Sequence, residues 1–102
     1  TPHELDNTYC VYHQYTVKIP NRDNIHKMLQ EAGIGAMLYY PVPLHLQKVH
    51  AHLGWTKGML PNTEKDTECV ISLPMFPELT LEEQKTVAST LIECIEKSKA
   101  LA

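Results

Sequence analysis

The sequence has 102 residues, a length that suits one domain of ordinary size, and 43% of them are hydrophobic, which is enough to build a core. The net charge is −3 and the basic residues are scattered, which excludes the concentrated basic surface of a nucleic-acid-binding protein. No apolar run approaches the roughly 20 residues that cross a membrane and no signal peptide opens the chain, so we expect a cytoplasmic protein without membrane contact.

The first predicted element is a strand over residues 10–19. The polar residues 1–7 before it begin at Thr1 and not at a methionine, which we interpret as a linker or the severed end of a longer protein. Side chains of the strand alternate with a period of two, and we expect the face with the following five residues to be buried: Val11, His13, Tyr15, Val17 and Ile19. His13 is the polar member of this face, and it is either a core histidine satisfied by a neighbour or part of a site.

A helix is predicted over residues 23–32. Asn21 is a favourable N-cap, and apolar side chains recur at helical spacing through the segment. Gly33 ends the helix, because glycine adopts positive φ without a steric penalty. A second strand follows over residues 36–40, and we expect the helix to cross over so that the two strands run parallel.

The loop after this second strand is made rigid by two prolines. Pro41 and Pro43 fix their own φ and push the residues before them toward extended geometry. Tyr39, Tyr40 and His45 therefore lie on a preset scaffold, and we predict ligand contacts there, because rigidly held loops carry much of protein function. The alternative is that one tyrosine packs in the core and the other side chains lie on the surface.

The rest of the chain predicts two short helices, an extended segment and a long helix. The short helices cover residues 46–53, ended by Gly54, and residues 61–70, begun by Pro61. Prolines confine the extended segment at residues 71–77 to an edge or an end of the sheet.

The long helix opens with a capping box formed by Thr80 and Glu83 and runs to about residue 99. We expect its apolar stripe to pack on the sheet: Val87, Ala88, Leu91, Ile92 and Ile95. The order β-α-β-α-α-β-α predicts an α+β fold, with a small mixed sheet of about three strands covered by helices.

Histidines and cysteines give no convincing metal or disulfide pattern. His45, His50 and His52 lack the spacing of a helical zinc pair, so we predict no metal site. The three cysteines are far apart and odd in number, so we expect buried free thiols: Cys10, Cys69 and Cys94.

Three motifs follow one another along the chain. They are His13-Gln14-Tyr15, then Gly33-Ile34-Gly35 with Tyr40-Pro41-Val42-Pro43-Leu44-His45, and finally Ser72-Leu73-Pro74-Met75-Phe76-Pro77 with Leu79-Thr80. In this order they resemble the C-terminal small domain of the DegT/DnrJ/StrS family, the pyridoxal-phosphate-dependent sugar aminotransferases of fold type I, and the resemblance covers residue 11 to about residue 97.

This resemblance implies a homodimeric enzyme of polysaccharide biosynthesis that transfers an amino group, usually from glutamate, to a nucleotide-linked keto-sugar. The family holds pyridoxal phosphate on a lysine of a large domain, and none of those motifs maps here. The resemblance therefore implies that residues 1–102 are a small domain with no catalytic or cofactor-binding residue, inactive alone, with an apolar patch exposed where the large domain docks.

The resemblance also bears on the substrate-binding residues. Tyr40 matches the usual family tyrosine, whereas Tyr39 stands where histidine is commoner. A phenol can donate a hydrogen bond to a phosphate or sugar oxygen, but it cannot bring positive charge. His45 matches a family histidine and either binds substrate or locks the loop. The competing hypothesis is a stand-alone regulatory or ligand-sensing module without catalysis.

Overall fold

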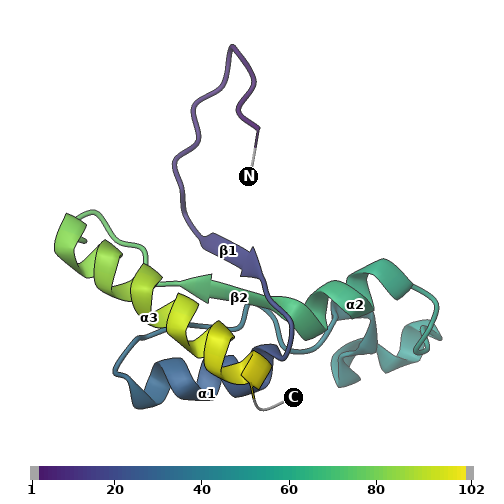
Figure 1. Cartoon of the computed structure of the whole chain (residues 1–102). Helices are drawn as coiled ribbons and strands as arrows, with labels where there is room; N and C mark the ends of the chain where they lie inside the picture. Colours follow the sequence, from purple (N-terminus) through teal and green to yellow (C-terminus); the bar gives the residue numbers. More distant parts are fainter. Residues whose placement is uncertain (1–2, 101–102) are drawn as a thin grey trace.

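The computed structural model describes residues 3–100 and has two strands, three α-helices and two short 3₁₀ helices. Their bounds, in chain order, are β1 Tyr15–Lys18, α1 Arg22–Glu31, η1 Leu44–Leu46, η2 Lys48–Leu53, α2 Pro61–Cys69, β2 Val70–Leu73 and α3 Leu81–Ala100. Helices α1 and α3 lie side by side against the sheet, whereas α2 leads away from them beyond the start of β2 (Figure 1). The predicted α+β class is confirmed.

The sheet is smaller than the sequence indicates. β1 and β2 pair antiparallel, with Thr16 opposite Ser72, and the two hydroxyl oxygens lie 2.8 Å apart. The predicted strand over residues 36–40 is reduced to one antiparallel bridge, in which Met37 and Ser72 exchange backbone hydrogen bonds of 2.8 and 2.9 Å. Because Met37 and β1 are each antiparallel to β2, they run in the same direction, with β2 between them.

The first strand is also shorter than predicted, and its expected buried face is only partly correct: Ile19 lies in the core and Val17 packs against it, whereas Val11, His13 and Tyr15 are exposed. Residues 10–14 are outside the strand, and Val11 is 81% exposed. β1 begins at Tyr15, opposite Leu73, and the next residue of β2 would be Pro74. A proline has no N–H for the ladder, so pairing stops there and residues 10–14 have no strand to cover them.

Both ends of α1 are defined by residues with positive φ. Asn21 stands at the N-cap as predicted, but its φ is 52° and its side chain does not cap the helix. Its Nδ2 instead donates to Ser98 Oγ at 2.7 Å and joins α1 to the last turn of α3. At the other end, Gly33 has φ 79°, and two hydrogen bonds close the helix: Ile34 N–H to the Leu29 carbonyl and Gly33 N–H to the Gln30 carbonyl.

The α-helix predicted over residues 46–53 is two 3₁₀ turns. Gln47 lies between η1 and η2 with extended backbone (ψ 139°), and the N–H groups of Leu46 and His50 donate to carbonyls three residues back. So short a segment gains too few i→i−4 bonds to offset the cost of nucleating an α-helix. Gly54 ends η2 as predicted, with φ 76°.

The capping box of α3 forms as predicted. Thr80 N–H donates to Glu83 Oε2 at 2.8 Å, and Glu83 N–H donates to Thr80 Oγ1 at 3.2 Å. The apolar stripe is only partly correct, because Ala88 and Ile92 are exposed and the residues that α3 buries include Ser98. No helix within residues 3–100 is long and apolar enough to cross a membrane.

The core lies between α1, α3 and the sheet. Its buried members are Ile19, Ile25, Leu29, Ala36, Ile71 and Cys94. Of the three free thiols, only Cys94 is buried, and this desolvation raises the pKa of its thiol. Cys69 is half-buried and Cys10 is exposed, so the expectation of buried thiols is wrong for Cys10.

Candidate functional site

The two predicted tyrosines lie together at an exposed corner of the chain. Tyr39 and Tyr40 are joined by a cis peptide bond, and their rings meet edge to face with centroids 5.7 Å apart. Tyr39 is 38% exposed and Tyr40 is 63% exposed, so neither phenol is part of the core. Two rigid hydrogen-bond donors therefore face outward just before the proline loop.

His45 is placed differently from the tyrosines. It is 8% exposed, and its Nε2 lies 3.0 Å from Glu64 Oε1. The Trp55 ring stands edge-on to the imidazole, with centroids 6.3 Å apart. The structure thus brings Tyr39 and Tyr40 together but places His45 against an acidic partner, 19 positions away in the sequence.

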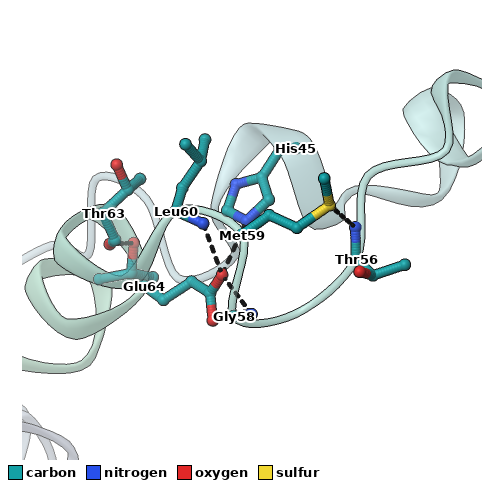
Figure 2. A network of polar contacts seen from close by, with 8 residues as sticks. His45, Thr56, Gly58, Met59, Leu60, Thr63 and Glu64 are labelled. Atoms are coloured by element: carbon teal, nitrogen blue, oxygen red, sulfur yellow. Dashed lines mark hydrogen bonds and ion pairs between the residues drawn. The ribbon is translucent and has the colours of Figure 1, made fainter.

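Glu64 is the centre of this polar cluster (Figure 2). Besides His45, its carboxylate accepts the Gly58 N–H at 2.8 and 2.9 Å and the Leu60 N–H at 3.4 Å. The side chains of both Glu64 and His45 are largely buried, at 11% and 6% exposed. Glu64 lies in the first turn of α2, and nothing in the spacing of the sequence indicates its pairing with His45.

The hydrogen bonds to Glu64 determine its charge. Burial raises the pKa of this carboxyl, but the hydrogen bonds from His45, Gly58 and Leu60 lower it by more, and the pKa lies below the ordinary value of 4.5. Glu64 is therefore ionised at neutral pH and can only accept hydrogen bonds. It follows that His45 Nε2 carries a hydrogen and donates the hydrogen bond to Glu64.

Two hollows flank β2 and the start of α3. The first, here called the tyrosine hollow, has a volume of about 730 Å³ and is bordered by Tyr39, His13, Gly33 and Ser72 among others. The second, here called the apolar groove, has a volume of about 910 Å³, and no charged residue lines it. His13 borders both hollows and is exposed, which contradicts its predicted burial.

The described lysines do not fit a covalently bound aldehyde cofactor. All of them are exposed: Lys18, Lys27, Lys48, Lys57, Lys65, Lys85, Lys97 and Lys99. No lysine or arginine borders either hollow. Lys18 donates to Asp66 at 2.7 Å, which raises the pKa of its ammonium, whereas a Schiff-base lysine needs a lowered pKa. These lysines therefore offer no site at which pyridoxal phosphate could be held as a Schiff base.

The part of the chain between residues 3 and 100 holds no cluster of three His, Cys, Asp or Glu side chains that could bind a metal ion. The histidines considered for such a site have other contacts: His45 donates to Glu64, and His52 Nδ1 lies 3.2 Å from the Val49 carbonyl.

Comparisons with known proteins agree on one family. The DegT/DnrJ/EryC1/StrS aminotransferase family matches residues 1–92. A "Pleiotropic regulatory protein" of Geobacillus stearothermophilus is 50% identical over 93 residues, which are 91% of this chain and 25% of that protein. A UDP-N-acetyl-3-dehydro-alpha-D-glucosamine 3-aminotransferase of Acidithiobacillus ferrooxidans is 41% identical over 79% of this chain and 21% of that enzyme.

The fold has a solved counterpart in the same family. DesV of S. venezuelae, crystallised in complex with a ketimine intermediate, superposes with a TM-score of 0.84 at 33% identity, over 93% of this chain and 26% of DesV. The chain thus spans about a quarter of the length of the curated relatives it matches. By both sequence and fold, the chain belongs to the DegT/DnrJ/EryC1/StrS aminotransferase family.

Proposed function

We propose that this chain is the C-terminal small domain of a pyridoxal-phosphate-dependent aminotransferase that transfers an amino group, from glutamate, to a nucleotide-linked keto-sugar. In this proposal the chain supplies a substrate-facing corner, and the cofactor is held by a domain outside these 102 residues. The observation that supports it most is the exposed pair Tyr39 and Tyr40, two hydrogen-bond donors on a proline-braced loop of a chain that belongs to this family.

The extent of the surface supports the view that these residues pack against a larger body. The chain exposes 8001 Å², whereas a compact monomer of its mass exposes about 5,800 Å². Its radius of gyration is 16.1 Å, against about 13 Å for a compact domain of this length. The excess of about 2,200 Å² is of the order that permanent interfaces bury, which suits both a large domain and a homodimeric partner.

The apolar groove is the surface we assign to that contact. It runs between the residues that precede β1 (the N-terminal arm, residues 8–14), the segment after β2 and the exposed side of α3, and it includes Val11, Phe76 and Ile92. Large apolar side chains without an interspersed charge are typical of surfaces that a partner covers.

The exposure of the site residues supports the roles that we propose for them. Tyr39 and Tyr40 donate hydrogen bonds to phosphate or sugar oxygens of the nucleotide-sugar, because both phenols face outward. His45 locks the loop from behind, since it is buried and donates to Glu64.

The test is an activity assay with two proteins, the full-length protein and residues 1–102 alone. With pyridoxal phosphate, glutamate and nucleotide-linked 3- or 4-keto-sugars, the full-length protein should yield an amino-sugar nucleotide and 2-oxoglutarate, measured by mass spectrometry. Residues 1–102 alone should yield neither. Covalent cofactor binding and turnover by residues 1–102 alone would contradict the proposal that this domain needs a second domain for catalysis.

A second candidate function is a regulatory or ligand-sensing module without catalysis. It is favoured by one observation, the name "Pleiotropic regulatory protein" of the relative that is 50% identical. The coding sequence upstream of Thr1 separates the two: a preceding region of a few hundred residues with a cofactor lysine supports the enzyme, and a stop codon and start site directly upstream of Thr1 support the module.

A further inference from the structure

Residues 44–69, here called the outer lobe, take no part in the hydrophobic core of the described chain. The lobe comprises η1, η2, the connector after them and α2, and Figure 1 shows α2 set apart from α1 and α3. Its one buried residue is a polar one, His45. Leu46 is half-buried, and six large apolar side chains of the lobe are exposed: Leu44, Val49, Leu53, Trp55, Met59 and Leu60. Apolar burial therefore contributes little to holding the lobe in place.

Hydrogen bonds to one carboxylate join the parts of the lobe to one another, while Asp66 and the Cys69 carbonyl tie the end of α2 to Lys18 and Ile19. Glu64 on α2 accepts from His45 on η1 and from the backbone N–H groups of Gly58 and Leu60 in the connector. His45 lies 19 positions before Glu64, and Gly58 and Leu60 lie six and four positions before it, so the three donors fasten η1 and the connector to α2 (Figure 2). A largely buried carboxylate with several donors forms stronger hydrogen bonds than neutral groups do.

A short segment of chain connects the Glu64 cluster to the corner that carries Tyr39 and Tyr40. Four residues separate Tyr40 from His45, and two of them are prolines with restricted φ. The Leu46 N–H donates to the Pro43 carbonyl at 2.9 Å, which joins the end of this stiff segment to η1. A short link with restricted backbone therefore connects His45 to the tyrosines.

We infer that Glu64 is a positioning residue for substrate binding: through His45 its carboxylate latches the outer lobe and thereby fixes the corner that carries Tyr39 and Tyr40. The inference rests on the proposed function, in which this corner faces the nucleotide-sugar. Glu64 touches no reacting atom, so its effect is on binding and not on chemistry.

The first test needs no catalytic activity. In the full-length protein, Glu64→Gln preserves the side-chain shape but presents N–H donors to Gly58 and His45, while Glu68→Gln makes the same change on an exposed residue of the same helix. Hydrogen exchange of backbone amides in residues 44–60 should accelerate about tenfold or more in Glu64→Gln and stay unchanged in Glu68→Gln, because His45 and the N–H groups of Gly58 and Leu60 lose a charged acceptor. Amides of the core residues Leu29 and Ile71 should exchange as in the wild type.

The second test is the kinetic one. With wild-type transamination established, Glu64→Gln should raise the KM for the nucleotide-sugar about tenfold with kcat changed less than about twofold, since only uniform binding is lost. The half-reaction with the amino donor should be unaffected. Combining His45→Gln with Glu64→Gln should be no worse than either change alone, as expected for two partners of one interaction.

The outcomes separate the inference from the function beneath it. Unchanged exchange of residues 44–60 in both Glu64→Gln and Glu64→Ala overturns the latch, whatever the activity. Faster exchange with an unchanged KM overturns the positioning role. A wild-type protein without sugar transamination refutes the proposed function, while the exchange measurement still judges the latch.

Discussion

Gly33 and Gly35 lie two positions apart but differ in their backbone φ angles. Gly33 has φ 79° and closes α1, whereas the φ of Gly35 lies outside the left-handed region. At neither position would an added Cβ meet another atom within 4 Å. Any difference between substitutions here therefore comes from backbone conformation and not from packing.

Gly33→Ala should lower the free energy of unfolding by roughly 1–2 kcal/mol, because alanine at positive φ places Cβ against the neighbouring carbonyl. Gly35→Ala is the matched control and should cost little. Urea denaturation followed by circular dichroism measures both. Equal effects of the two substitutions would contradict the assignment of the cost to positive φ.

Tyr40→Phe should weaken binding of the nucleotide-sugar to the full-length protein by about 0.5–1.5 kcal/mol, the contribution of one neutral hydrogen bond. Tyr9→Phe, at another exposed tyrosine in the N-terminal arm, is the control and should leave binding unchanged. Isothermal titration with the substrate nucleotide-sugar gives both values. If Tyr40→Phe binds like the wild type, Tyr40 is not in the site.

Single residues also show where prediction from sequence ends. Asn21 was correctly placed at the start of α1, but its side chain reaches Ser98, 77 positions later, in place of the helix N-terminus. Likewise the sequence draws attention to His45 as a candidate site residue, yet nothing in it indicates the partner Glu64. Local spacing predicts local hydrogen bonds, and these two bonds depend on tertiary contacts.

At the scale of elements, the predictions succeeded where the signal is local. The Gly33 stop and the Thr80 capping box each involve residues within one or two turns, and both form as expected. Strands are different, because a strand exists only if its partner can pair. The alternating residues 10–14 were predicted as strand, but Pro74 ends the ladder on β2, so they extend as an unpaired arm.

The capping box predicts a pH effect on α3. Hydrogen bonds from the Thr80 N–H and hydroxyl lower the pKa of Glu83 below its ordinary value of 4.5. A lowered folded-state pKa means that the stabilisation is complete above about pH 4.5 and is lost as the pH falls through the folded-state pKa. Thr80→Ala should raise the Glu83 pKa toward 4.5, and Thr86→Ala on the same helix should not.

An NMR titration of the Glu83 carboxyl carbon in the wild type and both variants makes this measurement. A Glu83 pKa that is the same in the wild type and in Thr80→Ala would show that the hydroxyl of Thr80 does not act on this carboxylate.

At the scale of the whole molecule, the sequence indicated the fold class and the family, but not how the chain distributes its apolar residues. The expected stripe of α3 splits, with Val87 turned to the core and Ile92 left 56% exposed in the apolar groove. Helical periodicity marks an apolar face without stating which body covers it. The third strand predicted over residues 36–40 is likewise only one bridge, between Met37 and Ser72.

The exposed groove predicts that residues 1–102, when isolated, associate with themselves. Sedimentation velocity should show a weight-average mass that rises with concentration, because an uncovered apolar surface gains by burial. Ile92→Lys should reduce this association, and Ser89→Lys, which adds the same charge on α3 outside both hollows, should not. A monomer at every concentration would count against the groove as a contact surface.

The hydrogen bond between Asn21 and Ser98 has a practical consequence for anyone who trims this polypeptide. The stretch that matches the family ends at residue 92, yet Cys94 and Ser98 beyond it are buried, and Ser98 fastens the tail of α3 to the head of α1. A truncation after residue 92 would remove the last two turns of α3, including Ser98, and would expose the N-terminal end of α1. Shortened versions for crystallisation or grafting should retain at least residue 98.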